Sequence, residues 1–213
     1  MRIVKISPEK PNMRLIREAG NLLREGKLVA YPTDTVYGLG ADPFNTIAIE
    51  NLLKTKRRSK ELGLPILVPD KNVARRTAEF TPEAELLSKK FWPGALTLVL
   101  KPRIEIPRIV TGNRNSIAIR FPAHKVPQLL AKHIGGTLIG TSANISGKPP
   151  ALNAHQVQAQ IGSEVDMILD GGEVLSKKPS TIIDLTEKPP VILREGCISR
   201  QSIKRVLKNR VKE

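Results

Sequence analysis

The fold is decided first by the sequence Leu28-Val29-Ala30-Tyr31-Pro32-Thr33-Asp34-Thr35-Val36-Tyr37-Gly38-Leu39-Gly40, in which an apolar run meets a polar segment flanked by glycine. The run 28–31 predicts a short buried strand, and Pro32 ends it because proline has no N–H to donate to a sheet. The segment that follows brings two hydroxyls, a carboxylate and a phenol to the end of that strand. By itself it fits a Thr/Asp turn and a ligand contact equally well.

Helices are predicted on both sides of this strand. Upstream, Leu15, Ile16, Ala19, Leu22 and Leu23 share one helical face, with Asn12 as the N-cap and Gly26 as the stop. Downstream, a second helix is expected from Thr46 to about Lys56. Further strands are predicted at 65–68, 96–100, 116–121, 137–140, 167–169, 181–185 and 191–194. A further helix is predicted from Thr81, whose hydroxyl is the expected N-cap ahead of Pro82, and others near 126–134 and 154–161.

This order of elements favours an α/β or α+β domain with one mixed sheet over a doubly wound parallel fold. The expected division is one main domain over residues 1–198 and a basic helix or tail over 199–213. One strand, 116–121, alternates so that Ile117, Ile119 and Phe121 share a face opposite Ser116, Ala118 and Arg120. Arg120 therefore either snorkels from a half-buried sheet or clamps a carboxylate.

Composition and charge restrict the function class. The 213 residues carry 35 Lys+Arg against 20 Asp+Glu, a formal charge of +15, with 40% hydrophobic residues. Cys197 is the single cysteine, so an internal disulfide or a thiolate zinc site is excluded, and a reducing compartment, the cytoplasm, is expected. No secretion signal is recognised, and the apolar runs fall far short of the roughly 20 residues that span a bilayer. The positive charge suits nucleic acid, a polyphosphate substrate or no specific partner.

The usual nucleotide and metal motifs are missing. No Walker P-loop and no G-x-G-x-x-G is present, so any phosphate site must be built differently. His124, His133 and His155 have no metal-ligand spacing. No metal site is therefore predicted from protein side chains.

A basic cluster, Lys54-Thr55-Lys56-Arg57-Arg58-Ser59-Lys60, closes the second helix. Cations at a helix C-terminus complement the helix dipole, so charge alone favours a solvated helix end. The same cations also suit a triphosphate, since Arg offers a planar fork and Lys a point charge.

A second polar cluster, Thr141-Ser142-Ala143-Asn144-Ile145-Ser146-Gly147, follows an apolar strand. If it is extended, Ser142, Asn144 and Ser146 project from one side and can hold a ligand with its magnesium; capping and turn chemistry explain them equally well. Ser180-Thr181 and Arg194 are weaker signals of the same kind.

Taken in order, these segments resemble the YrdC/Sua5 family of threonylcarbamoyl-AMP synthases from about Leu15 to Gly196. Residues 32–40 resemble its P-T-[DE]-T-x-Y-G-L motif, and Lys56-Arg57-Arg58 resembles its K-x-R motif. The other matching segments are Phe91-Trp92-Pro93-Gly94-Ala95-Leu96-Thr97, Arg120-Phe121-Pro122-Ala123-His124, Ser142-Ala143-Asn144-Ile145-Ser146-Gly147, Asp170-Gly171-Gly172, Ser180-Thr181 and Arg194-Glu195-Gly196. Ser59 departs from the proline that often follows K-x-R, and the length resembles the short, single-domain form.

The resemblance implies a twisted mixed sheet with flanking helices around a large, basic, concave cavity for ATP, Mg²⁺, L-threonine and bicarbonate. Lys56, Arg58, Ser142 and Asn144 are the expected catalytic residues. ATP is expected on Lys56, Arg58, Ser116, Asn144 and Arg194, and threonine on Thr33, Arg120, Ser142 and Ser180, with Arg120 pairing the threonine carboxylate. Magnesium is expected to arrive with ATP.

The implied reaction makes threonylcarbamoyl-AMP and pyrophosphate for the N6-threonylcarbamoyladenosine modification of tRNA, ahead of a downstream threonylcarbamoyl transferase complex. Alignment and charge neutralisation then replace a catalytic triad. His124 is the only nearby candidate base, and a structural role is preferred for it. Lys56 is expected on a solvated helix end, so its replacement should abolish ATP binding and leave the fold intact. The alternatives are a non-catalytic double-stranded RNA or tRNA binding protein and the carbamoyl-transfer domain of hydrogenase maturation proteins.

Overall fold

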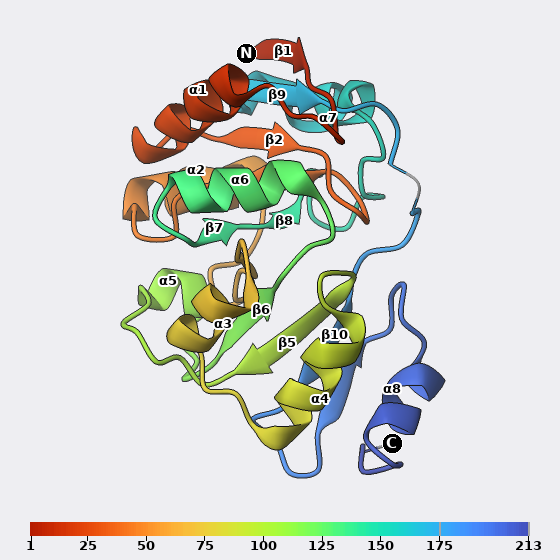
Figure 1. The fold of residues 1–213 in the computed structure, drawn as a ribbon. Coiled ribbons are helices and arrows are strands. Elements are labelled where there is room, and N and C mark those ends of the chain that lie inside the picture. Colours follow the sequence, from red (N-terminus) through yellow and green to blue (C-terminus); the bar gives the residue numbers. More distant parts are fainter. Residues whose placement is uncertain (175, 213) are drawn as a thin grey trace.

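The computed structural model describes residues 1–174 and 176–212 and contains two β-sheets stacked along the long axis of the molecule (Figure 1). The first sheet has the strand order β1-β9-β2-β3-β8. Strand β9 is parallel to β1 and β2, whereas β3 runs antiparallel to both of its neighbours. The bounds are β1 (Arg2–Lys5), β2 (Val29–Tyr31), β3 (Gly38–Gly40), β8 (Thr141–Ser142) and β9 (Met167–Asp170).

The second sheet has the order β11-β10-β5-β6-β4-β7. Its pairs β10–β5 and β4–β6 are parallel, and β10–β11, β5–β6 and β4–β7 are antiparallel. The mixed α/β class is therefore confirmed. The bounds are β4 (Ile66–Leu67), β5 (Leu96–Leu100), β6 (Ile117–Arg120), β7 (Leu138–Ile139), β10 (Thr181–Asp184) and β11 (Val191–Arg194).

The expectation of a single sheet is wrong, because the predicted strand 137–140 divides at Gly140. Before this residue β7 pairs with β4 of the second sheet, and after it β8 pairs with β3 of the first. A side chain at position 140 would overlap the Leu67 side chain, so only glycine lets the chain cross here without displacing β4. The crossover at Gly140 thus places Ser142 and its neighbours where the two sheets meet.

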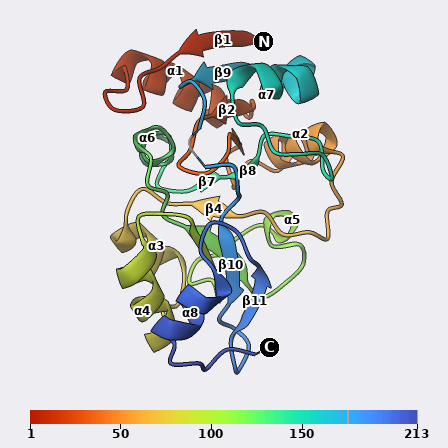
Figure 2. The same ribbon diagram turned by 90° about the vertical axis from the view of Figure 1, so that its right-hand side faces the viewer.

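Helices cover both sheets (Figures 1 and 2). The helices α1 (Met13–Arg24) and α6 (Lys125–His133) pack together beside the first sheet, and α2 (Thr46–Lys56) and α7 (Ala154–Ile161) lie on its other side. The helices α3 (Lys71–Thr77) and α4 (Pro82–Phe91) lie beside the second sheet, α5 (Arg108–Thr111) contacts α2, and α8 (Arg200–Val206) contacts α4. A 3₁₀ turn, η1 (Gly162–Glu164), follows α7.

The predicted caps are confirmed. The Asn12 side chain accepts from the Arg14 N–H, and the Thr81 hydroxyl accepts from the Ala84 N–H with Pro82 in the first helical turn. Such side chains satisfy the N–H groups that a helix leaves free at its start. The short elements α3, α5 and β3 were not predicted, because each has too few residues for a periodic pattern to show.

The C-terminal segment from residue 199 begins as a helix and continues as irregular chain. Helix α8 ends at Val206, and Lys208 and Asn209 adopt left-handed conformations with φ of 50° and 63°. Ile203 and Leu207 are buried in the main core, so this helix is anchored to the body of the protein. Glu213 lies outside the described residues. Within those residues, no helix is long and apolar enough to cross a membrane.

Candidate functional site

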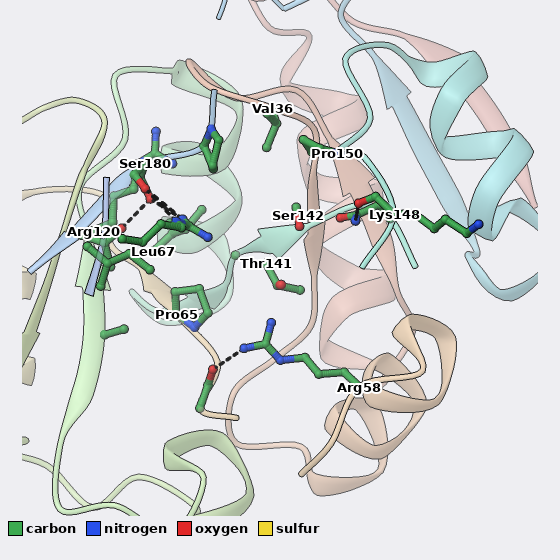
Figure 3. Close-up of a pocket in the computed structure, with 18 residues that line it drawn as sticks. Val36, Arg58, Pro65, Leu67, Arg120, Thr141, Ser142, Lys148, Pro150 and Ser180 are labelled. Carbon is green, nitrogen blue, oxygen red and sulfur yellow. Dashed lines mark hydrogen bonds between the residues drawn. The ribbon is translucent and has the colours of Figure 1, made fainter. Parts of the chain in front are cut away.

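A cavity of about 260 Å³ lies where the two sheets meet (Figure 3). Both sheets contribute to its wall, as do the loops after α2, β8 and β9. Its described lining includes no aspartate or glutamate and four cationic residues, so it is suited to anions. The lining residues are Val36, Arg58, Gly63, Pro65, Leu67, Thr97, Ala118, Arg120, Gly140, Thr141, Ser142, Asn144, Lys148, Pro150, Pro179, Ser180, Ile182 and Arg194.

Strand alternation in the second sheet supplies one wall. In β6, Ala118 and Arg120 line the cavity, while Ile119 is fully buried in the core on the opposite face. In β5, Thr97 likewise faces the cavity and Leu98 the core. This confirms the predicted two-faced strand at 116–121, because successive side chains of a strand point to opposite faces.

Arg120 is held by three hydrogen bonds. Its Nε donates to the Gly94 carbonyl at 2.9 Å, and one Nη donates to the Thr35 hydroxyl at 3.0 Å. The other Nη forms an ion pair with the Asp34 carboxylate at 2.6 Å. A guanidinium has five N–H groups, so two remain for a ligand. Arg120 is thus a preoriented clamp and does not snorkel to bulk solvent.

Ser180 and Arg194 form a second polar group on the same wall. The Ser180 hydroxyl lies 2.8 Å from the buried Thr97 hydroxyl. The Arg194 guanidinium donates to the Ser180 carbonyl from both Nε, at 3.2 Å, and Nη2, at 2.9 Å. Partial desolvation of the guanidinium lowers the pKa of Arg194, although the residue as a whole is exposed, and the charges of Arg120 and Arg58 add to this effect. The arginines of the cavity are therefore close enough to repel one another. The described lining contains no carboxylate between them.

Arg58 enters from the opposite side, at the end of α2 (Figure 3). Arg57 ends the helix in a left-handed conformation, with φ 50° and ψ 44°, which turns the chain toward the cavity. Arg58 Nη2 donates to the Gly63 carbonyl at 2.9 Å, whereas its buried Nε has no hydrogen-bond partner among the described residues. Burial lowers the pKa of Arg58.

The loop after β8 supplies the cavity's neutral polar groups. The amide nitrogen of the Asn144 side chain donates to the carbonyls of Ile145 and Lys148, at 2.8 and 2.7 Å. Its Oδ1 is buried and has no partner in the described part of the chain. An unsatisfied buried acceptor is costly, so Oδ1 is a group that a bound ligand or cation can satisfy.

Lys56 does not lie where the sequence suggests. Its side chain is 1% exposed and does not line the cavity, so the expected solvated helix end is wrong at this position. Its Nζ donates to the main-chain carbonyls of Ser142 and of Asn144, the latter at 2.9 Å. The loop that follows β8 covers this helix end, which the sequence pattern of α2 could not reveal.

Thr33 and Ser116 also lie outside the described cavity lining. The buried Thr33 hydroxyl donates to the Val36 carbonyl at 2.7 Å and lies 3.0 Å from the Thr35 hydroxyl. Thr33 thus shapes the 32–36 turn and supports Arg120 through Thr35. Ser116 is half-buried and precedes β6, on the same strand face as Ala118. Six predicted residues do line the cavity: Arg58, Arg120, Ser142, Asn144, Ser180 and Arg194.

Three polar lining residues were missed. Thr97 is a hydroxyl in an otherwise apolar strand, Leu96-Thr97-Leu98-Val99-Leu100, and that pattern is a usable signal. Thr141 directly precedes Ser142. Lys148 lines the cavity, and Figure 3 shows its side chain extending away from the other lining residues. In the sequence, nothing distinguishes it from a surface lysine.

His124 has a structural position. Its Nδ1 accepts from the Val126 N–H at 3.2 Å as the N-cap of α6. Burial lowers the pKa of His124, which favours the neutral ring, and acceptance at Nδ1 corresponds to the tautomer with its proton on Nε2. The preference for a structural role is thereby supported.

Tyr37 fixes the segment that follows Thr33. Its hydroxyl donates to the Gly172 carbonyl at 2.8 Å and accepts from the Gly171 N–H at 3.0 Å. The Asp170-Gly171-Gly172 motif thus anchors the 32–40 segment from the neighbouring strand β9.

The described residues contain no group of three or more His, Cys, Asp or Glu side chains that could bind a metal ion.

Comparison with known proteins identifies relatives of the whole domain. A threonylcarbamoyl-AMP synthase of Pyrococcus abyssi is 42% identical over 193 residues, which cover 90% of this chain and 57% of that protein. A putative threonylcarbamoyl-AMP synthase of Mycobacterium tuberculosis is 35% identical over 201 residues, which cover 94% of this chain and 92% of the relative. The chain therefore spans little more than half of the Pyrococcus protein and nearly all of the mycobacterial one.

A solved structure agrees with these relatives. The crystal structure of P. abyssi Sua5 complexed with L-threonine matches with a TM-score of 0.93 and 39% identity, over 100% of this chain and 63% of that chain. The family model Sua5/YciO/YrdC, described as telomere recombination, matches residues 21–196. Since that match includes every strand except β1 and every residue that lines the cavity, the chain belongs to the Sua5/YciO/YrdC family.

Proposed function

We propose that this protein is an L-threonylcarbamoyladenylate synthase, which joins L-threonine, bicarbonate or CO₂, and ATP into threonylcarbamoyl-AMP and pyrophosphate. The observation that carries the proposal is the convergence of Arg58, Arg120 and Arg194 on one cavity whose described lining holds no carboxylate. ATP carries about four negative charges, and Arg binds phosphate and carboxylate through paired N–H donors. The relatives named threonylcarbamoyl-AMP synthase support the same reaction.

The two walls of the cavity suit the two halves of the reaction. Arg58 and Asn144 approach from one side, and each keeps a buried polar atom without a partner among the described residues. We assign the triphosphate to this side, with Arg194 across the cavity helping to hold the nucleotide. We also assign Ser116 to the nucleotide. It lies outside the described cavity lining, on the same strand face as Arg120.

The opposite wall suits an amino acid. Arg120 keeps two N–H groups for the threonine carboxylate, and the Ser180 hydroxyl lies on the same wall. The solved P. abyssi Sua5 complexed with L-threonine supports an amino-acid site in this fold. Ser142, at the junction of the sheets, is placed between the two substrates. Thr33 is assigned a supporting role through Thr35.

The reaction requires alignment more than acid–base chemistry. The neutral threonine amine forms an N–C bond with CO₂ and releases one proton to solvent, or forms it with bicarbonate and loss of water, and either route gives an N-carboxylate. An oxygen of this carboxylate attacks the α-phosphorus of ATP, the bond from that phosphorus to the bridging oxygen breaks, and pyrophosphate leaves with the electron pair. Fixed cations stabilise the charge that develops at phosphorus and on the leaving group.

Mg²⁺ accompanies ATP in this proposal. The described lining offers neutral oxygen ligands, such as the unpartnered Asn144 Oδ1 and the Ser142 hydroxyl, and hard cations prefer oxygen ligands. These residues fit a magnesium ion that is bound mainly by phosphate oxygens and water. The ion would supply charge neutralisation on the triphosphate.

We further propose that the product is passed to a threonylcarbamoyl transferase complex for modification of tRNA. Since ATP and the tRNA acceptor are cytoplasmic, the cytoplasm is the proposed site of the reaction. Direct contact of tRNA with this protein is a separate proposal, for which the net charge of +15 is the support.

The test is release of pyrophosphate from ATP. We expect release to require both L-threonine and bicarbonate, and to fall by roughly a hundredfold or more in Arg58→Met, because a charge-assisted phosphate contact is lost. Arg57→Met is the matched control, since the neighbouring Arg57 is exposed and does not line the cavity. If neither cosubstrate stimulates release, the synthase is refuted. Absence of any release would favour the non-catalytic RNA-binding alternative.

A further inference from the structure

Lys56 belongs to the K-x-R segment that the family resemblance assigns to ATP binding, yet it occupies a different place from Arg58. We propose that Lys56 is a positioning residue: it holds the 142–146 loop through main-chain carbonyls and does not contact the nucleotide. This inference rests on the proposed function only for the effect on catalysis, because the contacts themselves are made within the protein.

Three hydrogen bonds join Lys56 to this loop. The Nζ donates to the carbonyls of Ser142 and Asn144, and the main-chain carbonyl of Lys56 accepts from the Ser146 N–H at 2.8 Å. One residue at the end of α2 therefore fixes three alternate residues of a loop that lies 86 to 90 positions later in the chain.

The end of α2 explains why Lys56 and Arg58 act differently. Lys56 is the last helical residue, and the left-handed Arg57 reverses the chain direction before Arg58. The Arg58 N–H closes the helix by donating to the Leu53 carbonyl at 2.9 Å. As a result the Lys56 side chain is buried beneath the loop, and Arg58 reaches the cavity.

The loop that Lys56 holds carries the neutral polar groups of the cavity. Ser142 and Asn144 both line it, and the unpartnered Asn144 Oδ1 is aimed by the hydrogen bonds of the same side chain to Ile145 and Lys148. A shift of the loop would move Ser142 and Asn144 together. A displacement of about 1 Å in an active site can lower turnover even when no ligand contact is removed.

The surroundings of Nζ favour neutral acceptors over a phosphate. Its described hydrogen-bond acceptors are two main-chain carbonyls, and both belong to the 142–146 loop. Lys56 itself does not line the cavity. The Nζ is therefore engaged within the protein.

The decisive measurement is amide hydrogen exchange of the ligand-free protein. In Lys56→Met we expect the Asn144 and Ser146 amides to exchange roughly tenfold faster or more, because the loop loses two of its anchoring hydrogen bonds. Exchange within α1 and β5 should be unchanged. Lys54→Met is the matched control, since Lys54 is exposed on the same helix and should leave the loop as it is. If the loop amides of Lys56→Met exchange at the same rate as those of the wild type, the proposal is overturned.

A second variant separates hydrogen bonding from charge. Glutamine has two N–H donors and no charge, so Lys56→Gln should restore slow exchange of the loop and part of the pyrophosphate release that Lys56→Met loses. A phosphate-binding lysine would instead make Lys56→Gln as poor as Lys56→Met. If Lys56→Met does not fold, the comparison of Lys56→Gln with wild type still decides between these outcomes.

Ligand affinities provide the last distinction. If Lys56 is a positioning residue, Lys56→Met should lower the affinities for L-threonine and for ATP together. If Lys56 contacts phosphate directly, the variant should lose affinity for ATP and keep its affinity for L-threonine. Selective loss of ATP with a well-protected loop would overturn the inference. Because exchange in the ligand-free protein does not depend on turnover, failure of the synthase proposal would leave this test intact.

Discussion

The Arg120 guanidinium forms a 2.6 Å ion pair with the Asp34 carboxylate, and the two side chains are only 8% and 15% exposed. Asp34 belongs to the 32–40 segment of the first half of the fold, and Arg120 ends β6 of the second sheet. The pair therefore joins the two halves at the edge of the cavity and fixes the guanidinium that we assign to the threonine carboxylate.

Removal of Asp34 should destabilise the protein. Asp34→Ala leaves a buried guanidinium without its carboxylate, at a cost of about 3 kcal/mol. Asp34→Asn keeps an oxygen acceptor for Arg120 and should cost clearly less. Urea unfolding of the two variants measures the difference. Equal stability of Asp34→Ala and wild type would show that the pair does not hold the two halves together.

A methyl group at Gly196 should disturb the amino-acid wall. A Cβ at this position would overlap the Pro179 carbonyl and lie 2.6 Å from the Ser180 carbonyl carbon, so main chain and not a flexible side chain must move. Gly196→Ala is expected to lower stability by about 2 kcal/mol, as overpacking does, and to weaken L-threonine binding. Calorimetry with L-threonine tests this, with the exposed Glu195→Ala as control. Unchanged affinity in Gly196→Ala would mean that Ser180 does not contact threonine.

His124 should contribute to stability and not to catalysis. His124→Ala removes the N-cap of α6 and is expected to cost about 1 kcal/mol, whereas Asn, itself a good N-cap, should retain most of that stability. Pyrophosphate release should stay near wild type in His124→Asn. A large drop in turnover for this variant, with its stability preserved, would reassign His124 as a proton-transfer residue.

The buried Lys56 predicts a pH dependence of stability. Its pKa is about 7 in the folded protein against an ordinary value of 10.5, so between these values the unfolded chain binds the extra proton. Stability due to this group therefore rises with pH across that window, by roughly 2 kcal/mol from pH 7 to pH 9. The free energy of unfolding of wild type relative to Lys56→Met should show this rise. A difference that is constant with pH would place the pKa of Lys56 outside the window.

Local structure in this protein follows from local sequence. Asn12 and Thr81 cap the helices that their spacing predicts, because a capping side chain needs only the N–H groups two or three residues ahead. The alternation in β6 puts Ile119 in the core and Arg120 on the cavity face for a similarly local reason. The ordered motifs that indicate the family are likewise readable without coordinates.

Contacts between distant segments could not be read in this way. The division of the strand 137–140 depends on the close approach of Gly140 to Leu67, and the hydroxyl of Thr33 is engaged by its own turn. The charge pattern at the end of α2 is the same whether that end faces water or a loop. The sequence by itself determined the longer elements and most of the polar residues of the cavity, since these depend on near neighbours. Tertiary structure alone decided that Arg58 reaches the cavity while Lys56 is buried beneath the 142–146 loop, because the carbonyls that bind Lys56 lie 86 and 88 residues further along the chain.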